Sequence, residues 1–332
     1  MKTHITSSAT VLPSAKTVGA NENSAYLSDV NYAEYIEPKL LRRMSKVIRM
    51  SVAAAKIALR EAGLENPEAI LVGTGLGCLT DTQRFLTDMC SAEEGVLSPT
   101  AFIQSTHNTI AGQIGLLLEC NGYNSTYSDR AHSFEQALLD AQLHLLEGSD
   151  NILVGAADET VDLVENVVRS INETGNSSGV TKDYFLGEGS SFFVVSDKKK
   201  LNSIELKGLK LMPRTNPSEL QAVLTDFLSS HSIAPNEIDL IILGDWPNTG
   251  DKYYAAFREV FNNSIPTAFY KKQSGHYFTS SAYALHLGCH ILRTQSIPES
   301  ISGTHPPEQI LQNILIYNHY KANKHSFCLI SK

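Results

Sequence analysis

Residues 124–159 constrain the fold more than any other stretch, because they predict a strand, a sharp turn, a buried helix and a second strand in immediate succession. Thr126 and Tyr127 end an extended run, since β-branched and aromatic residues suit a pleated strand. The next segment has helical periodicity, and Gly148 stands where a left-handed C-terminal cap is expected. Its apolar face comprises Phe134, Ala137, Leu138, Ala141 and Leu145. Residues 151–155 then predict a buried strand.

The turn at residues 129–133 lies where many α/β enzymes place a nucleophile. Such a turn exposes one side chain at the positive end of the helix and aims backbone N–H groups beside it. The residue at this corner is Ala131. A methyl group can neither attack a thioester nor hold an acyl chain, so the corner itself predicts no covalent catalysis.

Residues 124–159 resemble the segment of β-ketoacyl synthases that carries the active-site cysteine. Residues 151–159 (Asn-Ile-Leu-Val-Gly-Ala-Ala-Asp-Glu) match the strand and the acidic turn that follow it, and residues 187–190 (Gly-Glu-Gly-Ser) resemble the family's Gly-Glu-Gly-Ala. Counting without gaps places Ala131 on the cysteine. The resemblance therefore implies a ketosynthase-like chain without the family's nucleophile.

The family's other catalytic groups are a lysine and two histidines, which promote decarboxylation and condensation. In the match to His-Gly-Thr-x-Thr-Pro-x-Gly-Asp, Leu243 falls on the first histidine. In the match to Lys-x-x-x-Gly-His, Lys271 and His276 are both kept. Because a second position is lost, an engineered replacement of the cysteine is the poorer explanation of Ala131. A structural ion pair or hydrogen bond in the core would also explain Lys271 and His276.

The order of predicted elements repeats within the chain. A helix at about 38–62, a turn at Pro67 and a strand at 69–74 are echoed by a helix at 220–230, a turn at Pro235 and a strand at 239–244. Duplication of a segment within a chain produces such a repeated order of helix, turn and strand. Together with the resemblance, this predicts an α/β, thiolase-like fold of two pseudo-repeats in layered αβαβα architecture. Its halves would be residues 1–199 and 200–332, packed as one compact unit.

Composition excludes several classes of protein. The net charge of −8 disfavours nucleic-acid binding, and the five cysteines are odd in number and lack Cys-x-x-Cys spacing, so no disulfide framework or metal site is expected. Residues 73–77 (Gly-Thr-Gly-Leu-Gly) lack the third glycine of a dinucleotide loop, and a close backbone crossing explains them better. No run approaches the roughly 18 apolar residues of a membrane span. We expect a cytoplasmic protein.

Residues 104–114 (Gln-Ser-Thr-His-Asn-Thr-Ile-Ala-Gly-Gln-Ile) resemble the short ketosynthase-like branch of aryl polyene and flexirubin-type pigment pathways. The chain therefore resembles the chain length factor of a type II ketosynthase pair. This implies a heterodimer with a cysteine-bearing ketosynthase, no cofactor of its own, and substrates carried on the phosphopantetheine of an acyl carrier protein. Two alternatives remain: a malonyl-carrier-protein decarboxylase that uses His276 and Lys271, and a homodimeric module that binds acyl chains or carrier proteins.

Two surfaces are predicted from this resemblance. Lys39, Arg42 and Arg43 match basic positions near the tunnel mouth of ketosynthases and would receive the carrier protein, although a solvated helix face explains them equally. The loop at residues 98–107 would lie at the subunit interface, where Phe102 helps to close the partner's tunnel; core packing is the alternative. The predicted tunnel and interface set is Phe102, Ile103, His107 and Asn108.

Overall fold

Ten strands form one mixed sheet in the computed structural model, which describes residues 2–13, 26–91, 99–173, 186–244, 251–303, 310–320 and 324–332. The strands of the first half are β1 (Thr3–Val11), β2 (Ala69–Gly73), β3 (Tyr123–Tyr127), β4 (Ile152–Asp158) and β5 (Gly189–Ser196). Those of the second half are β6 (Ile204–Met212), β7 (Leu240–Leu243), β8 (Thr267–Phe269), β9 (Asn313–Tyr320) and β10 (Lys324–Ser331).

The two halves of the sheet have the same internal order. The sheet runs β3-β2-β4-β5-β1-β6-β10-β9-β7-β8, so the second half, read from its outer edge, is β8-β7-β9-β10-β6. In each half the second strand is parallel to two neighbours, and the other pairings are antiparallel. Antiparallel pairing of β1 with β6 joins the halves. The echo in the sequence is therefore a repeat in the topology.

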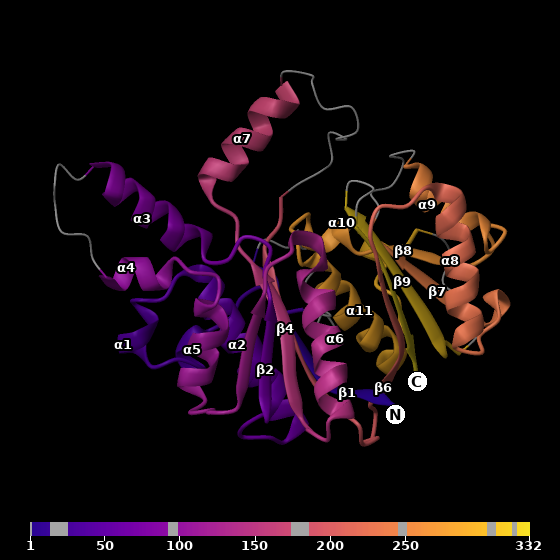
Figure 1. Cartoon of the computed structure of the whole chain (residues 1–332), viewed down its shortest axis with the longest axis horizontal. Coiled ribbons are helices and arrows are strands. Elements are labelled where there is room, and N and C mark those ends of the chain that lie inside the picture. The colour runs from indigo at the N-terminus through magenta and orange to yellow at the C-terminus, as the bar shows by residue number, and fades with distance from the viewer. Residues whose placement is uncertain are drawn as a thin grey trace.

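Helices form three layers around this sheet (Figure 1). The layer between the two halves contains α6 (Ser133–Leu146) and α11 (Ser280–Thr294), whose apolar faces share one core with β2, β4, β7 and β9. On the outer face of the first half lie α2 (Lys46–Ala62) and α5 (Thr109–Leu117). On the outer face of the second half lie α8 (Pro217–Ser230) and α9 (Lys252–Glu259). The layers therefore follow the predicted αβαβα order.

Alternation along the strands explains why both faces of the sheet are covered. In β2, Ala69 and Leu71 pack in the central core, whereas Ile70 and Val72 pack in the outer core with α2 and α5. Successive side chains of a strand point to opposite faces, so a strand with apolar residues at every position requires helices on both sides. The continuous apolar runs of the sequence therefore correspond to strands buried on both faces.

The prediction of one helix over residues 38–62 is wrong at its start. The structure has a short helix α1 (Pro38–Leu41) and then α2, which begins at Lys46. Ser45 is extended, with φ −66° and ψ 167°, and the side chain of Met44 is buried, so the chain turns there to bring Met44 into the core. The end is as predicted, because Gly63 caps α2 in the left-handed conformation with φ 71°.

Three further helices lie at one end of the layered body, at the top and left of Figure 1: α3 (Leu79–Ser91), α4 (Pro99–Gln104) and α7 (Asp162–Glu173). The expectation of a loop over residues 98–107 is therefore wrong at Pro99–Gln104, and Ser98 lies outside the described residues. Proline is favoured at the first position of a helix, because a backbone N–H at that position would have no hydrogen-bond partner within the helix. Across the described residues, no helix has both the length and the apolar character needed to cross a membrane.

Candidate functional site

The corner around Ala131 is built by a short 3-10 turn, Arg130–His132, between β3 and α6. Arg130 adopts a left-handed φ of 52°. The hydroxyl of Ser133 closes the turn, since it accepts a hydrogen bond from the Asp129 N–H at 2.8 Å and donates to the Arg130 carbonyl at 2.7 Å. Ala131 is 5% exposed. The side chain at the predicted nucleophile position is therefore a nearly buried methyl group.

Gly73 allows β2 to approach this corner closely. A Cβ at Gly73 would lie 2.6 Å from backbone atoms of Ser133 and Phe134, at the start of α6. A Cβ at Gly75 would instead meet the side chain of Phe278, at 2.3 Å. The predicted close backbone crossing inside the core is confirmed at Gly73.

Three consecutive residues of β10, which we call the strap (Lys324, His325 and Ser326), cross beside the corner. Lys324 forms an ion pair with Asp129. The His325 carbonyl lies 3.1 Å from Nε2 of His132, and the Ser326 hydroxyl donates to Oε1 of Glu135 at 2.8 Å. Burial lowers the pKa of His132, and the nearby charge of Lys324 lowers it further. The strap thus contacts positions before, within and after the turn.

Lys271 and His276 lie together on one short segment before α11. Lys271 begins α10 (Lys271–Ser274) and is buried, with its Nζ 5.7 Å from the ring centre of Tyr270. The His276 carbonyl accepts a hydrogen bond from the Gly187 N–H at 3.0 Å, and its ring lies nearly parallel to that of Tyr320 at 6.4 Å. A Cβ at Gly187 would lie 1.8 Å from the Ser274 carbonyl oxygen. The Gly-Glu-Gly motif therefore packs directly against the segment that carries the retained lysine and histidine.

Leu243 lies in a different layer from Ala131. It is the last residue of β7 and is fully buried in the outer core with Tyr254 and Phe257 of α9. Ala131 instead precedes α6, in the central layer. Most of the motif that follows Leu243 falls at residues 245–250, outside the described residues. The correspondence of Leu243 with the family's first histidine stays a prediction.

Two functional surfaces predicted from the sequence lie side by side. Lys39, Arg42 and Arg43 are exposed, and the Arg43 carbonyl accepts a hydrogen bond from the Gln104 side chain of α4 at 3.3 Å. On α4, Phe102 is 57% exposed and Ile103 is 63% exposed, so core packing within this chain does not explain them. Basic and apolar groups therefore share one surface.

The other two members of the predicted interface set are exposed at the start of α5. Asn108 precedes the helix, and its side chain makes no capping hydrogen bond among the described residues. A Cβ at Gly77 would lie 2.9 Å from the ring of His107, so that histidine covers the glycine loop. The structure thus places His107 against the loop that follows β2.

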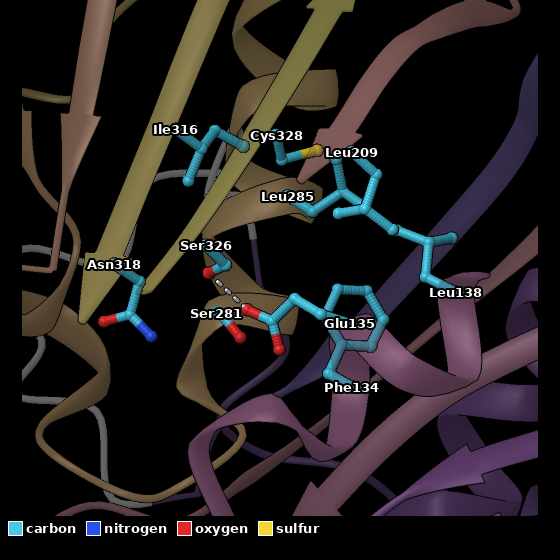
Figure 2. A pocket seen from close by; sticks show the side chains of 10 residues that line it. All are labelled: Phe134, Glu135, Leu138, Leu209, Ser281, Leu285, Ile316, Asn318, Ser326 and Cys328. Carbon is cyan, nitrogen blue, oxygen red and sulfur yellow. Dashed lines mark hydrogen bonds between the residues drawn. The ribbon is translucent and has the colours of Figure 1, made fainter. Parts of the chain in front are cut away.

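The sequence interpretation missed Glu135, which lies one helical turn after Ala131 on the buried face of α6. Its side chain faces a small cavity in the central layer, of about 10 Å³ (Figure 2). The cavity lining also includes Leu138, Ser281, Leu285, Asn318 and Ser326. The available signal was an acidic residue on an otherwise apolar helix face.

Comparison with known proteins identifies the relatives of this chain. The family model described as "Beta-ketoacyl synthase, N-terminal domain" matches residues 18–232. A search of curated protein sequences found no match.

Three solved structures are similar over nearly the whole chain. A β-ketoacyl synthase from Burkholderia phymatum has 14% identity and a TM-score of 0.75, and covers 100% of this chain and 99% of its own. The ishigamide ketosynthase/chain length factor has 15% identity and a TM-score of 0.76, with the same coverage. A ketosynthase in complex with a type II PKS acyl carrier protein has 18% identity, a TM-score of 0.74 and 99% coverage of both chains. These similarities confirm the predicted thiolase-like fold.

Proposed function

Because this chain belongs to the β-ketoacyl synthase family, we propose that it is a non-catalytic subunit of the chain length factor type. It would pair with a cysteine-bearing ketosynthase in type II polyketide or fatty-acid-like synthesis of the aryl polyene kind. There it would complete the partner's acyl tunnel and limit product length. The substrates would be carried on an acyl carrier protein.

This proposal rests on the structure of the turn around Ala131. Ala131 has no nucleophilic atom, is 5% exposed, and lies beside a strap fixed through Asp129, His132 and Glu135. The cavity beside Glu135 has about the volume that a single water molecule needs, far less than an acyl chain occupies. An acyl chain would therefore be housed by the partner subunit.

A surface for that partner is available at the edge of the sheet. β3 is the outermost strand and pairs on one side with β2. Beside it, Leu139, Leu143 and Leu146 of α6 are exposed, as is Leu116 of α5. An edge strand with apolar neighbours favours pairing with a strand of another chain. The similar structures described as a ketosynthase/chain length factor and as a ketosynthase with its carrier protein support partners of these two kinds.

The second candidate is decarboxylation of malonyl-carrier protein by His276 and Lys271. It is favoured by the way Gly187 holds the segment that carries both side chains. This activity would need no cysteine, because decarboxylation forms no acyl-enzyme. Incubating the purified chain with malonyl-carrier protein, and following the acetyl product, tests it; His276→Ala should abolish any product formed.

Co-expression with a cysteine-bearing ketosynthase, followed by size-exclusion chromatography, tests the proposed function. We expect a one-to-one heterodimer. Leu143→Glu, beside β3, should break the complex. Leu201→Glu should leave it intact, because Leu201 is 91% exposed in the turn between β5 and β6, and β2 and β4 separate β5 from β3 in the sheet. A stable homodimer that takes up no ketosynthase would instead support the binding-module alternative.

A further inference from the structure

Another cavity lies beside β1, where residues of β1, α2 and α11 line it. β1 pairs with β6 only over Thr3–Ile5, because β6 begins at Ile204, so β6 does not continue beside the lining residues Ser8 and Thr10. The cavity has a volume of about 330 Å³. Sites for small molecules typically have roughly 300–1,000 Å³. The cavity is therefore large enough for a small ligand.

Two opposite charges face this cavity without pairing directly. Glu61 lies near the end of α2 and Arg293 near the end of α11, and both line the cavity. In the described part of the chain, no ion pair within 4.0 Å joins Glu61 to Arg293. Burial raises the pKa of the Glu61 carboxyl, and the charge of Arg293 opposes that shift, so the two groups are close enough to interact. The space between them can hold a group that carries both signs of charge.

The Arg293 guanidinium is fixed by three uncharged acceptors. Its Nε donates to the Asn202 carbonyl at 3.2 Å, and its two terminal nitrogens donate to the Ser8 hydroxyl at 3.1 Å and to the Ile5 carbonyl at 3.5 Å. A guanidinium has about five N–H donors, so about two stay available. Two parallel N–H groups are what a carboxylate accepts in a bidentate pair. Arg293 is therefore held in place with donors to spare for an anion.

The two ends of the cavity differ in polarity. Ile57, one helical turn before Glu61 on α2, is apolar and also lines the cavity. Tyr26 lines it too, and its ring packs edge-on against Tyr283 of α11 with a ring-centre distance of 6.2 Å. Tyr283 precedes Arg293 by ten residues, which is about 15 Å along a helix. The charged groups therefore lie at one end and aromatic and apolar groups toward the other.

We propose that this cavity binds a free α-amino acid with a large apolar side chain. The carboxylate of the ligand accepts from the Arg293 guanidinium, and its ammonium group donates to the Glu61 carboxylate. Its side chain lies toward Ile57 and Tyr26. His290 also lines the cavity, and burial and the charge of Arg293 lower its pKa, so its imidazole adds no third charge at neutral pH.

This site is separate from the corner around Ala131. α11 begins at Ser280, just after the segment that carries His276, and Arg293 lies near the other end of the helix. The 13 residues from Ser280 to Arg293 span about 20 Å of helix. A bound amino acid would instead connect the ends of α2 and α11 beside β1. This inference does not depend on whether the chain is a chain length factor.

Calorimetric titration of the full chain tests the site, with L-phenylalanine and L-leucine as probes. One molecule of either should bind to each chain. 3-Phenylpropionate lacks the ammonium group and phenethylamine lacks the carboxylate, so each should bind about tenfold more weakly than L-phenylalanine, because each loses a hydrogen bond between charged groups. Failure of both amino acids to bind, or equal affinity for either analogue, would overturn the proposal.

Glu61→Gln distinguishes this site from non-specific binding. It should weaken the binding of L-phenylalanine about tenfold, because the neutral amide does not attract the ammonium group. 3-Phenylpropionate should bind this variant at least as well as the native chain, because the repulsion between two carboxylates is removed. Glu65→Gln, at an exposed position just beyond α2, is the matched control and should behave as the native chain does. Unchanged affinity of Glu61→Gln for L-phenylalanine would show that the amino acid does not bind here.

Discussion

Asp158, at the end of β4, accepts two hydrogen bonds from Thr279 at the start of α11, from the backbone N–H at 3.0 Å and from the hydroxyl at 2.8 Å. Its other oxygen accepts from the Thr74 hydroxyl and from the N–H groups of Gly75 and Leu76. Burial raises the pKa of Asp158, and the hydrogen bonds from Thr279, Gly75 and Leu76 oppose that shift. One buried carboxyl thus ties the loop after β2 to the segment that follows His276.

Asp158→Asn should destabilise the protein by about 1.5–3 kcal/mol, because the amide N–H₂ then faces groups that donate. Urea unfolding at neutral pH measures this loss. Thr279→Ser keeps the hydroxyl and removes one methyl group, so it should cost no more than about 0.8 kcal/mol. Equal losses for the two variants would contradict the role given to the carboxyl.

Ala131→Cys should not restore condensation of acyl thioesters by this chain alone. The new thiol would lie at a nearly buried corner, and the first histidine of the family would still be missing if Leu243 stands in its place. Loss of one member of a catalytic unit typically lowers the rate by several orders of magnitude. Restoring the cysteine would therefore leave the rate limited by the missing histidine. Product formation from acyl- and malonyl-carrier protein is the measurement. Turnover without a partner subunit would show that the absence of the cysteine alone makes the chain inactive.

Phe102→Ala should lengthen the products of the heterodimer while leaving the complex intact. Phe102 is 57% exposed on α4 and contacts Phe85 with a ring-centre distance of 5.6 Å, so its truncation should change the stability of this chain by less than about 1 kcal/mol. Mass spectrometry of the products made with the ketosynthase gives the chain length. An unchanged length from an intact complex would remove Phe102 from the tunnel.

Charge reversal at Arg42 and Arg43 should weaken binding of the carrier protein and reduce its dependence on salt. Both side chains are exposed, and exposed charges attract an acidic partner mainly at low ionic strength. Calorimetric titration at two salt concentrations measures the effect. Arg214→Glu, also exposed, is the control and should change little. Equal affinity of native and reversed chains at low salt would favour the solvated-face alternative.

Local periodicity was enough to predict much of the fold. The apolar face of α6, the buried strands β2 and β4, and the caps at Gly63 and Gly148 each arise from residues close in sequence, and all are present. The break between α1 and α2 was missed because Met44 fits a helix pattern as well as a turn into the core. The pattern says which side chains are apolar, but not where the backbone must bend to bury them.

The polar contacts of the site could not be predicted in the same way. Asp158 meets Thr279, and Glu135 meets Ser326, across more than a hundred residues of intervening chain. An acidic residue after a strand, or on an apolar helix face, signals that donors must exist. The acidic residue does not show which distant hydroxyl will donate to it, because those groups come together only when the layers of the fold are complete.

The pairing of β1 has a consequence for how the chain emerges from the ribosome. His4 pairs with Ser196 on one side and with Glu205 on the other, so β1 is synthesised before both of its partner strands and waits for them. At about 5–20 residues per second, that wait lasts roughly 10–40 s. During this time both edges of β1 lack a partner strand, and an unpaired edge can pair wrongly with another strand. Slower translation before residue 205, or lack of a chaperone that covers nascent strands, should therefore lower the yield of soluble protein.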